Sequence, residues 1–472
     1  MKHSATLLHL RGAAGMAAIY RKISWRLLPM LMLCGVFAAL DRINIDHAQR
    51  QISASLDFAP QVYGWGAAAF LAAGCLFALP ANLLLEKLGT RKLLLRMMLG
   101  WGVTSAAGAF VRSPLEFYII RFLLGVFEAG FFPGAILYLT YWFPAARRAR
   151  VIAIFAASAL IAGLVAGPLC GATMRALHNE GGLDGWQWLL LTQGLPAALL
   201  GIGAWFYLDD GPGQARWLSG FEQQMVAQDL ARDEALLATG LDRDDDEDDD
   251  DDSVDAEAAL AVSWTLLRDP AIMLLALANL LLSAAGYALA HWAPALLQRW
   301  AAGDAAPASH AWLALLPPLA GIVGMIAIGH DSDRRRERRG HFIACMVLAA
   351  GGLALEIAAD DALAWSLAGL SLAALGIAAA VPLLAAILTD LLNGRRAAVG
   401  IALVCSVGLA GAAAGPALGA RLLAWGDSAA MLAALVGTCL AAGLALMLAL
   451  RLAPRRGGPH ARHGLSDKIA RS

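Results

Sequence analysis

The strongest constraint on this chain is a series of apolar runs, each about as long as a bilayer is thick. An apolar run of roughly 20 residues crosses a bilayer as an α-helix. Only 15% of the 472 residues are charged, against about 25% in soluble globular proteins. We therefore predict an all-α membrane protein. Its twelve transmembrane helices are expected near residues 27–48, 62–85, 93–111, 115–139, 151–174, 186–208, 271–297, 311–329, 342–359, 363–389, 399–423 and 429–450.

Clusters of basic residues follow alternate spans and predict the orientation. Lys and Arg accumulate in cytoplasmic loops. The segments "EKLGTRK" (86–92), "ARRAR" (146–150) and "DRRRERR" (333–339) all fall on the same side of the predicted membrane. We expect a multi-pass protein of a bacterial inner (cell) membrane with both termini in the cytoplasm.

The spans divide the chain into two halves joined by one long loop. The expected parts are a cytoplasmic tail (1–24), a six-helix half (25–208), a cytoplasmic linker (209–268), a second six-helix half (269–452) and a cytoplasmic tail (453–472). The linker contains "DRDDDEDDDDD", and self-repulsion predicts that this acidic run is disordered. No cleavable signal peptide is evident, and either Met1 or Met16 is the start.

The two halves share a sequence repeat. "RRARVIAIFAASALIAGLVAGPLCGA" (147–172) aligns without gaps to "RRAAVGIALVCSVGLAGAAAGPALGA" (395–420). Because each half has six spans, the repeat keeps its orientation in the membrane, as in the two halves of a major facilitator transporter. We expect two pseudo-symmetric six-helix halves, with substrate between them near the bilayer midplane. Both copies carry glycines four residues apart, a spacing that lets helices pack closely.

Four charged residues inside the spans have no counterpart in the other half. Asp41 and Arg42 lie in the first span, and Arg121 and Glu128 lie in the fourth. The repeat places only apolar residues or glycine at the corresponding positions. A charge inside the bilayer costs roughly 2.5–3.5 kcal/mol on insertion scales. Helix packing alone would not require these four residues, so they are candidates for function.

Helix geometry suggests how the four charges pair. Asp41 and Arg42 project about 100° apart, so each needs a partner on another helix. Arg121 and Glu128, seven residues apart, share a face with about 10 Å between them. Asp41 and Arg121 are expected at a similar depth in the membrane, which permits an ion pair between them. Arg42 is then left without a carboxylate partner and is available for an anionic substrate. The structural alternative is one network of all four charges that locks the two spans together.

Around these residues the chain resembles the anion:cation symporter family of the major facilitator superfamily. The likeness is dense over residues 25–220, in "WRLLP", "LDRINI", "LPANLLLEKLGTRK" and "RFLLGVFEAGFFPG". It continues more thinly through "GYALAHWAPALL" and "GHDSDRRR". The family includes bacterial permeases for tartrate, phthalate, hydroxyphenylacetate and sugar acids, and the sialin-type carriers.

The resemblance implies secondary active transport, with proton-coupled symport of a small organic carboxylate. It implies that Arg42 contacts the substrate carboxylate, that Asp41 pairs with Arg121 and responds to protonation, and that Glu128 carries the transported proton. Desolvation favours the protonated form of a carboxyl group, as a proton carrier requires. It also implies gating loops that stabilise the outward-open state, at Glu86, Gly89, Arg91, Asp333 and Arg334.

The second half departs from the family pattern. Where the family commonly has asparagines in span eleven, this chain has Cys405 and Leu409. The less polar second half favours an aromatic or otherwise less hydroxylated acid over a sugar acid. The expected substrate-binding residues are Arg42, Arg121, Tyr63, Tyr287, Trp292 and Ser406. Anchoring at the membrane interface explains Tyr63 about as well.

Other functions are weighed on specific features. The "GPLCG" of span five suggests an organic-anion exchanger or a proton-driven efflux antiporter, and the acidic linker suggests a transporter-like sensor. Arg42 argues against cationic drugs, because a fixed positive charge repels them. No nucleophile–base set, metal cluster or phosphate loop is evident, so we expect neither an enzyme nor a metal or cofactor. The expected partners are the organic anion, protons and the lipid bilayer, with no nucleic acid and a monomeric chain.

Overall fold

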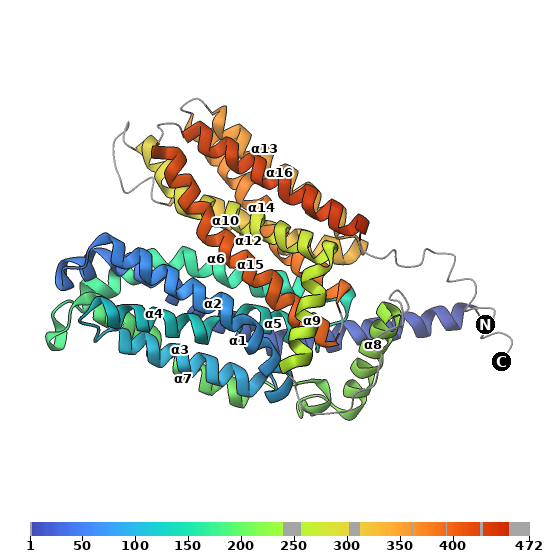
Figure 1. Ribbon diagram of the computed structural model, residues 1–472. Helices are drawn as coiled ribbons and strands as arrows, with labels where there is room; N and C mark the ends of the chain where they lie inside the picture. The colour runs from blue at the N-terminus through green and yellow to red at the C-terminus, as the bar shows by residue number, and fades with distance from the viewer. Residues whose placement is uncertain are drawn as a thin grey trace.

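The computed structural model describes residues 2–238, 256–301, 312–359, 362–392, 394–424 and 428–452 (Figure 1). Nearly all of this is α-helix. The first half comprises α1 (Lys2–Leu56), α2 (Pro60–Leu88), α3 (Thr90–Gly108), α4 (Pro114–Glu128), α5 (Phe131–Thr140), α6 (Ala145–Ala176) and α7 (Gly185–Tyr207). The linker forms α8 (Gly220–Ala238) and α9 (Ala256–Arg268). The second half comprises α10 (Pro270–Ala301), α12 (Leu316–Arg335), α13 (Arg339–Ile357), α14 (Leu363–Leu391), α15 (Gly394–Ala424) and α16 (Ser428–Leu452). Single 3₁₀ turns occur at Glu180–Gly182, Pro212–Gln214 and Leu313–Leu315.

The prediction of twelve membrane-spanning helices is confirmed. Among the described residues, eleven segments are long and apolar enough to cross a membrane, with α4 and α5 together forming one of them. The twelfth is α3, which packs against α4 and α7. Three basic residues near its start, Arg91, Lys92 and Arg96, lower its mean hydropathy.

Helix α1 begins well ahead of the first expected span. It continues as one helix from the segment expected to be a tail into the first span. No glycine or proline occurs between Met16 and Leu28, so nothing in that stretch favours a helix end. The acidic run at 244–252 and the tail at 453–472 lie outside the described residues.

Local signals fix several helix ends. At α4 the Ser113 hydroxyl accepts a hydrogen bond from the Glu116 amide, directly ahead of Pro114. At α7 Asp184 and Gln187 form a capping box. Between α2 and α3 the chain turns at Gly89, which has φ +78° and lies against Asp210. A side chain at this glycine would be strained and would overlap the carboxylate.

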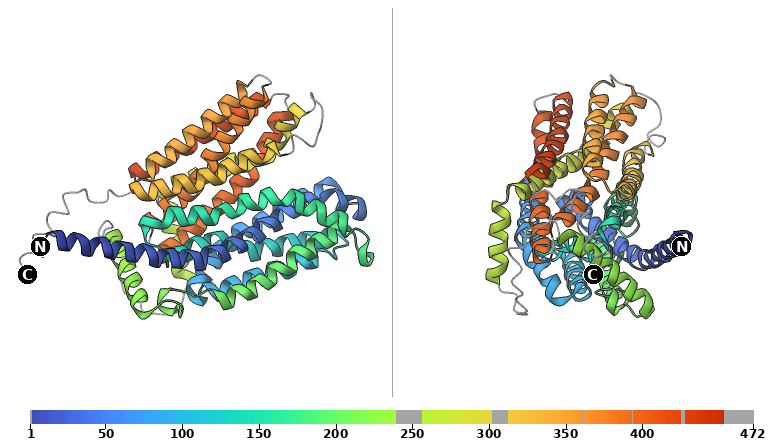
Figure 2. Two further views of the ribbon diagram at one scale, coloured as in Figure 1. Left: turned by 180° about the vertical axis from the view of Figure 1, so that it is seen from behind. Right: turned by 90° about the vertical axis from the view of Figure 1, so that its right-hand side faces the viewer.

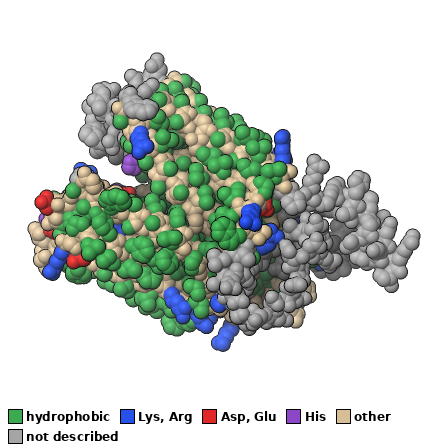
Figure 3. Space-filling model, in the orientation of Figure 1, with side chains coloured by type: hydrophobic (Ala, Val, Ile, Leu, Met, Phe, Trp, Pro, Cys, Tyr) green, Lys and Arg blue, Asp and Glu red, His purple; other side chains and the backbone are tan. Residues whose placement is uncertain are grey.

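The two halves meet along two pairs of helices and diverge at one end (Figures 1 and 2). The main contacts between them are α6 with α12 and α2 with α15. At the end of the bundle where α8 and α9 lie, which we call the linker end, α14 also packs on α6. At the opposite end, the open end, the space-filling view is hollowed between the halves (Figure 3). The described parts of α1 and α10 pack little against each other.

Equivalent glycines of the sequence repeat have different surroundings. A Cβ added at Gly411 or Gly415 of α15 would overlap a backbone carbonyl of α10, at Leu280 and Ala284 respectively. A Cβ added at Gly163 of α6 would meet no atom within 4 Å, and the same holds for its neighbour one turn later. The repeat therefore predicts a shared fold, whereas close backbone packing at these positions occurs only in the second half.

Candidate functional site

Helices α1 and α4 bring the four single-copy charges together in the first half. Asp41, Arg121 and Glu128 are 4%, 7% and 1% exposed. Arg121 and Glu128 lie on the buried stripe of α4 with Phe117 and Leu124. The prediction that Arg121 and Glu128 share one helix face is therefore confirmed.

Arg42 is bound to Glu128, which differs from the expectation that Arg42 is free. Its Nε lies 2.6 Å from Glu128 Oε2. The Arg42 side chain is 23% exposed and that of Glu128 only 1%. The second carboxylate oxygen, Oε1, is buried, and the Asp41 carboxyl group lies near enough to interact with Glu128. The pair thus joins α1 to α4, with Arg42 nearer to the space between the halves.

Asp41 is held by neutral donors, so the expected Asp41–Arg121 ion pair is not formed. Asp41 Oδ1 accepts hydrogen bonds from the Ser105 hydroxyl of α3 and from Asn44 Nδ2, the latter at 3.2 Å. Depth along the helices placed Asp41 and Arg121 at the same level, but it does not determine which way either side chain turns. The hydroxyl and amide stabilise the carboxylate in a position beyond ion-pairing distance of Arg121.

Of the two arginines at the site, Arg121 has no ion-pair partner among the residues that the structure describes. Asp41, Asp46 and Glu128 are near enough to influence its charge, yet no described carboxylate oxygen lies within 4.0 Å of its nitrogens. Its Nε and Nη1 are buried and make no hydrogen bond. Burial removes water from this guanidinium, and no ion pair compensates for the lost hydration. A bound anion would offset that desolvation cost.

Aromatic rings flank both arginines. The Arg121 guanidinium carbon lies 4.7 Å from the centroid of the Phe70 ring. That of Arg42 lies 5.7 Å from the centroids of both Phe70 and Phe132. Gly125 allows this arrangement, because a Cβ there would overlap the Phe70 carbonyl and push α2 away from α4. These contacts attract a cation to the ring faces and fix where the guanidinium groups lie.

Sequence reasoning missed Phe70, Phe132, Ser105 and Asn44. An apolar or small residue in a hydrophobic span carries no signal of its own. A buried carboxylate needs hydrogen-bond donors, but this requirement does not identify the helix that supplies them.

The other four expected substrate-binding residues differ in their contacts, and one of them, Tyr287, interacts with Arg42. Tyr287 of α10 is 50% exposed and interacts with the Arg42 guanidinium, so the second half reaches the site. Tyr63 donates to the Gln49 carbonyl and packs on Phe117.

Trp292 and Ser406 are engaged within or between helices. The Trp292 indole packs edge-on to His291, against Gly419 of α15. The Ser406 hydroxyl donates to the Ala402 carbonyl one turn earlier. Tyr287 of the second half thus interacts with Arg42, and the contacts described for the side chains of Trp292 and Ser406 are with α10 and α15.

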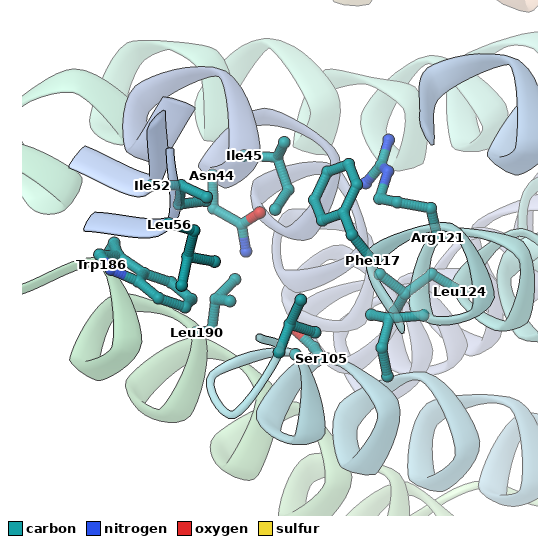
Figure 4. Close-up of a pocket in the computed structure, with 13 residues that line it drawn as sticks. Asn44, Ile45, Ile52, Leu56, Ser105, Phe117, Arg121, Leu124, Trp186 and Leu190 are labelled. Atoms are coloured by element: carbon teal, nitrogen blue, oxygen red, sulfur yellow. The ribbon is translucent and has the colours of Figure 1, made fainter. Parts of the chain in front are cut away.

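A small internal cavity adjoins Arg121 (Figure 4). Its volume is about 10 Å³, and its lining includes Asn44, Ser105 and Trp186. This is room for about one water molecule. An organic anion therefore does not fit into this cavity.

The expected gating residues take part in contacts at the linker end. Arg91 donates its Nε and Nη2 to the Trp205 carbonyl and its amide to Asp210. Asp333 of α12 accepts from the amides of Ala149 and Arg150 of α6, at 3.2 and 2.8 Å. Gly89 forms the turn described above, Arg334 is exposed, and the Glu86 side chain lies outside the described residues.

Two further sets of polar contacts at the linker end were not predicted from the sequence. Arg338 lies 2.6 Å from Asp390 of α14 and 3.4 Å from Asp333. Arg148 of α6 donates to the Thr389 carbonyl and pairs with Asp233 of α8. Basic clusters at 147–150 and 333–339 indicated orientation only, because their partners come from distant parts of the chain.

The described residues contain no group of three or more His, Cys, Asp or Glu arranged to hold a metal ion. The site instead consists of buried opposite charges on α1 and α4 of the first half, with Tyr287 of the second half interacting with Arg42. Two six-helix halves around a charged central site define a membrane transporter.

The chain belongs to the Major Facilitator Superfamily, whose family model matches residues 31–355. It is similar to a putative metabolite transport protein, NicT, of Pseudomonas putida, with 36% identity over 95% of this chain and 98% of that protein. A putative tartrate transporter of Agrobacterium vitis is also 36% identical, covering 85% of this chain and 84% of the relative. The fold is similar to the proton:xylose symporter XylE bound to 6-bromo-6-deoxy-D-glucose, with TM-score 0.64, 14% identity, and 90% and 94% of the two chains covered.

Proposed function

We propose that this transporter imports a small organic carboxylate together with protons across a bacterial inner membrane. The observation that carries the proposal is the Arg42–Glu128 ion pair beside the unpaired Arg121. The orientation follows from the basic loops, which gather at the linker end and are typical of the cytoplasmic side. The open end then faces the periplasm.

Charge balance explains how proton and anion are coupled. The formal charges of Asp41, Arg42, Arg121 and Glu128 sum to zero. A bound monocarboxylate adds one negative charge to a site of low dielectric, and such an uncompensated charge is costly. A proton on Glu128 restores the balance and at the same time cancels its attraction for Arg42. Substrate and proton therefore favour each other's binding.

The two arginines act at different stages of this cycle. Arg121 is available in the present conformation and attracts the anion first. Arg42 becomes available when Glu128 is protonated, and its planar guanidinium then offers a bidentate contact to the carboxylate. Arg42 therefore acts as a substrate ligand when Glu128 is protonated.

The substrate is expected to be poor in hydroxyl groups. Phe70, Phe132 and the exposed Tyr287 surround the arginines, and the Ser406 hydroxyl is bound within its own helix. A polyhydroxylated acid would leave buried hydroxyls without partners, which lowers its affinity. The similarity to proteins named as tartrate and metabolite transporters supports a carboxylate in general.

The test uses purified protein in liposomes with an inward proton gradient and labelled aromatic acids, hydroxy diacids and sugar acids. We expect accumulation of a carboxylate that a protonophore abolishes. Glu128→Gln should retain exchange and lose gradient-driven accumulation. Glu116→Gln, at the exposed start of the same helix, is the matched control and should transport normally.

Two results would contradict the proposal. Full accumulation by Glu128→Gln would remove this residue from coupling. Binding of a carboxylate with unchanged affinity by Arg121→Gln would remove this arginine from recognition. If the inward proton gradient drives the carboxylate out of the liposomes instead of into them, the antiporter alternative would be indicated.

A further inference from the structure

A basic groove lies at the linker end, away from the four central charges. It has a volume of about 920 Å³ and runs between α1, the end of α7 and the segment that leads to α8. Three arginines, Arg26, Arg91 and Arg216, line it together with the aromatic residues Tyr207 and Trp217. Neither the proposed transport cycle nor the contacts between the halves accounts for this concentration of positive charge.

The groove has little negative charge of its own. Its one lining carboxylate is Asp209, which accepts a hydrogen bond from Trp217 Nε1 at 2.7 Å. The Arg91 backbone amide donates to Asp210, but among the described side chains no carboxylate oxygen lies within 4.0 Å of the guanidinium nitrogens of Arg26, Arg91 or Arg216. The net charge of the lining therefore favours an anion.

Neutral groups hold two of the arginines in position. The Arg26 guanidinium lies 3.7 Å from the centroid of the Tyr207 ring, and its buried Nε has no hydrogen-bond partner. Arg91 donates to the Trp205 carbonyl. Rings and carbonyls orient a guanidinium without cancelling its charge, so both groups keep their attraction for an anion.

The surroundings indicate that the anion is part of a lipid. Phe206 lines the groove and is 76% exposed, and Trp25, next to Arg26, is 75% exposed. Exposed aromatic side chains at the ends of membrane-spanning helices are typical of the headgroup level of a bilayer. Basic pockets between helices at that level bind anionic headgroups. A water-soluble anion would make no use of the exposed phenyl ring.

We propose that this groove binds the phosphate headgroup of an anionic phospholipid from the leaflet at the linker end. The phosphate lies between Arg26 and Arg216, and an acyl chain runs along Phe206 into the bilayer. The lipid thereby connects α1, which carries Asp41 and Arg42, to the end of α7.

Native mass spectrometry of the full chain in detergent tests the proposal, with titrations of phosphatidylglycerol and phosphatidylethanolamine. We expect one tightly retained phosphatidylglycerol, and about fivefold weaker retention in Arg216→Gln, since one arginine near a charged headgroup is worth about 1 kcal/mol. Arg216 is exposed, so the variant should fold. Arg21→Gln removes an exposed arginine of α1 that does not line the groove, and it should bind like the unmodified protein.

The proposal is overturned if Arg216→Gln retains phosphatidylglycerol as strongly as the unmodified protein, or if Arg21→Gln weakens it equally. Equal retention of the two lipids would also overturn it, because the net charge would then play no part. A final arm adds millimolar inorganic phosphate. Displacement of the lipid by phosphate alone would identify a free-phosphate site, whereas the proposal requires that the lipid remain bound.

Discussion

The glycines of the repeat provide a matched pair of substitutions whose effects should differ in sign. Gly163 in α6 and Gly411 in α15 occupy equivalent positions of the two halves. A methyl group at Gly411 would overlap the Leu280 carbonyl of α10, and one at Gly163 would meet no atom within 4 Å. We expect Gly411→Ala to destabilise the protein and Gly163→Ala to leave it unchanged or stabilise it.

The magnitudes follow from two opposing effects. Replacing a helical glycine by alanine gains roughly 0.5–1 kcal/mol from lower backbone entropy in the unfolded chain. Inserting a methyl group into a packed contact costs about 1–3 kcal/mol. The carbonyl at Leu280 belongs to the backbone and cannot rotate aside, so α15 must move away from α10. The net expectation is a loss of up to about 2.5 kcal/mol for Gly411→Ala and a change between zero and a gain of about 1 kcal/mol for Gly163→Ala.

Thermal unfolding in detergent, followed by intrinsic tryptophan fluorescence, measures the difference. The midpoint should fall by a few degrees for Gly411→Ala only. Gly415→Ala and Gly167→Ala repeat the comparison one turn later, where the same asymmetry holds. Equal falls for the two members of either pair would refute the argument from helix packing.

Three further predictions concern the ends of the bundle. Asp333→Asn should weaken closure of the linker end by about 2 kcal/mol, roughly 30-fold in the population ratio. Spin-label distances across the open end would then shorten, while the exposed-site control Arg339→Gln should not change them; identical distances in both variants would contradict this role. The hydrogen bond from Lys22 holds the pKa of the Glu222 carboxyl below its usual 4.5, so the α1–α8 contact is present at neutral pH and lost as pH falls through that lowered value. Amide hydrogen exchange in α8, corrected for intrinsic rates, should rise as the pH falls through that lowered pKa, and a flat profile would count against it. Asp184→Ala removes the capping box of α7 and should lower the free energy of unfolding, measured with denaturant, by about 1 kcal/mol. An unchanged unfolding midpoint would contradict this.

The sequence by itself determined the number of spans, the division into halves and the positions of the four single-copy charges. Span length follows from bilayer thickness, and the repeat relates the halves without any knowledge of packing. Helical periodicity also placed Arg121 and Glu128 on one face, because a spacing of seven residues is close to two turns.

Only the tertiary structure decided how those charges pair. Whether Arg42 or Arg121 binds a carboxylate depends on side-chain directions and on donors from a third helix, such as Ser105. The unequal surroundings of Gly163 and Gly411 were hidden for the same reason, since identical residues experience different neighbours once the halves pack differently. The residue pattern determines what one helix can present, whereas contacts between helices depend on residues far apart in the chain.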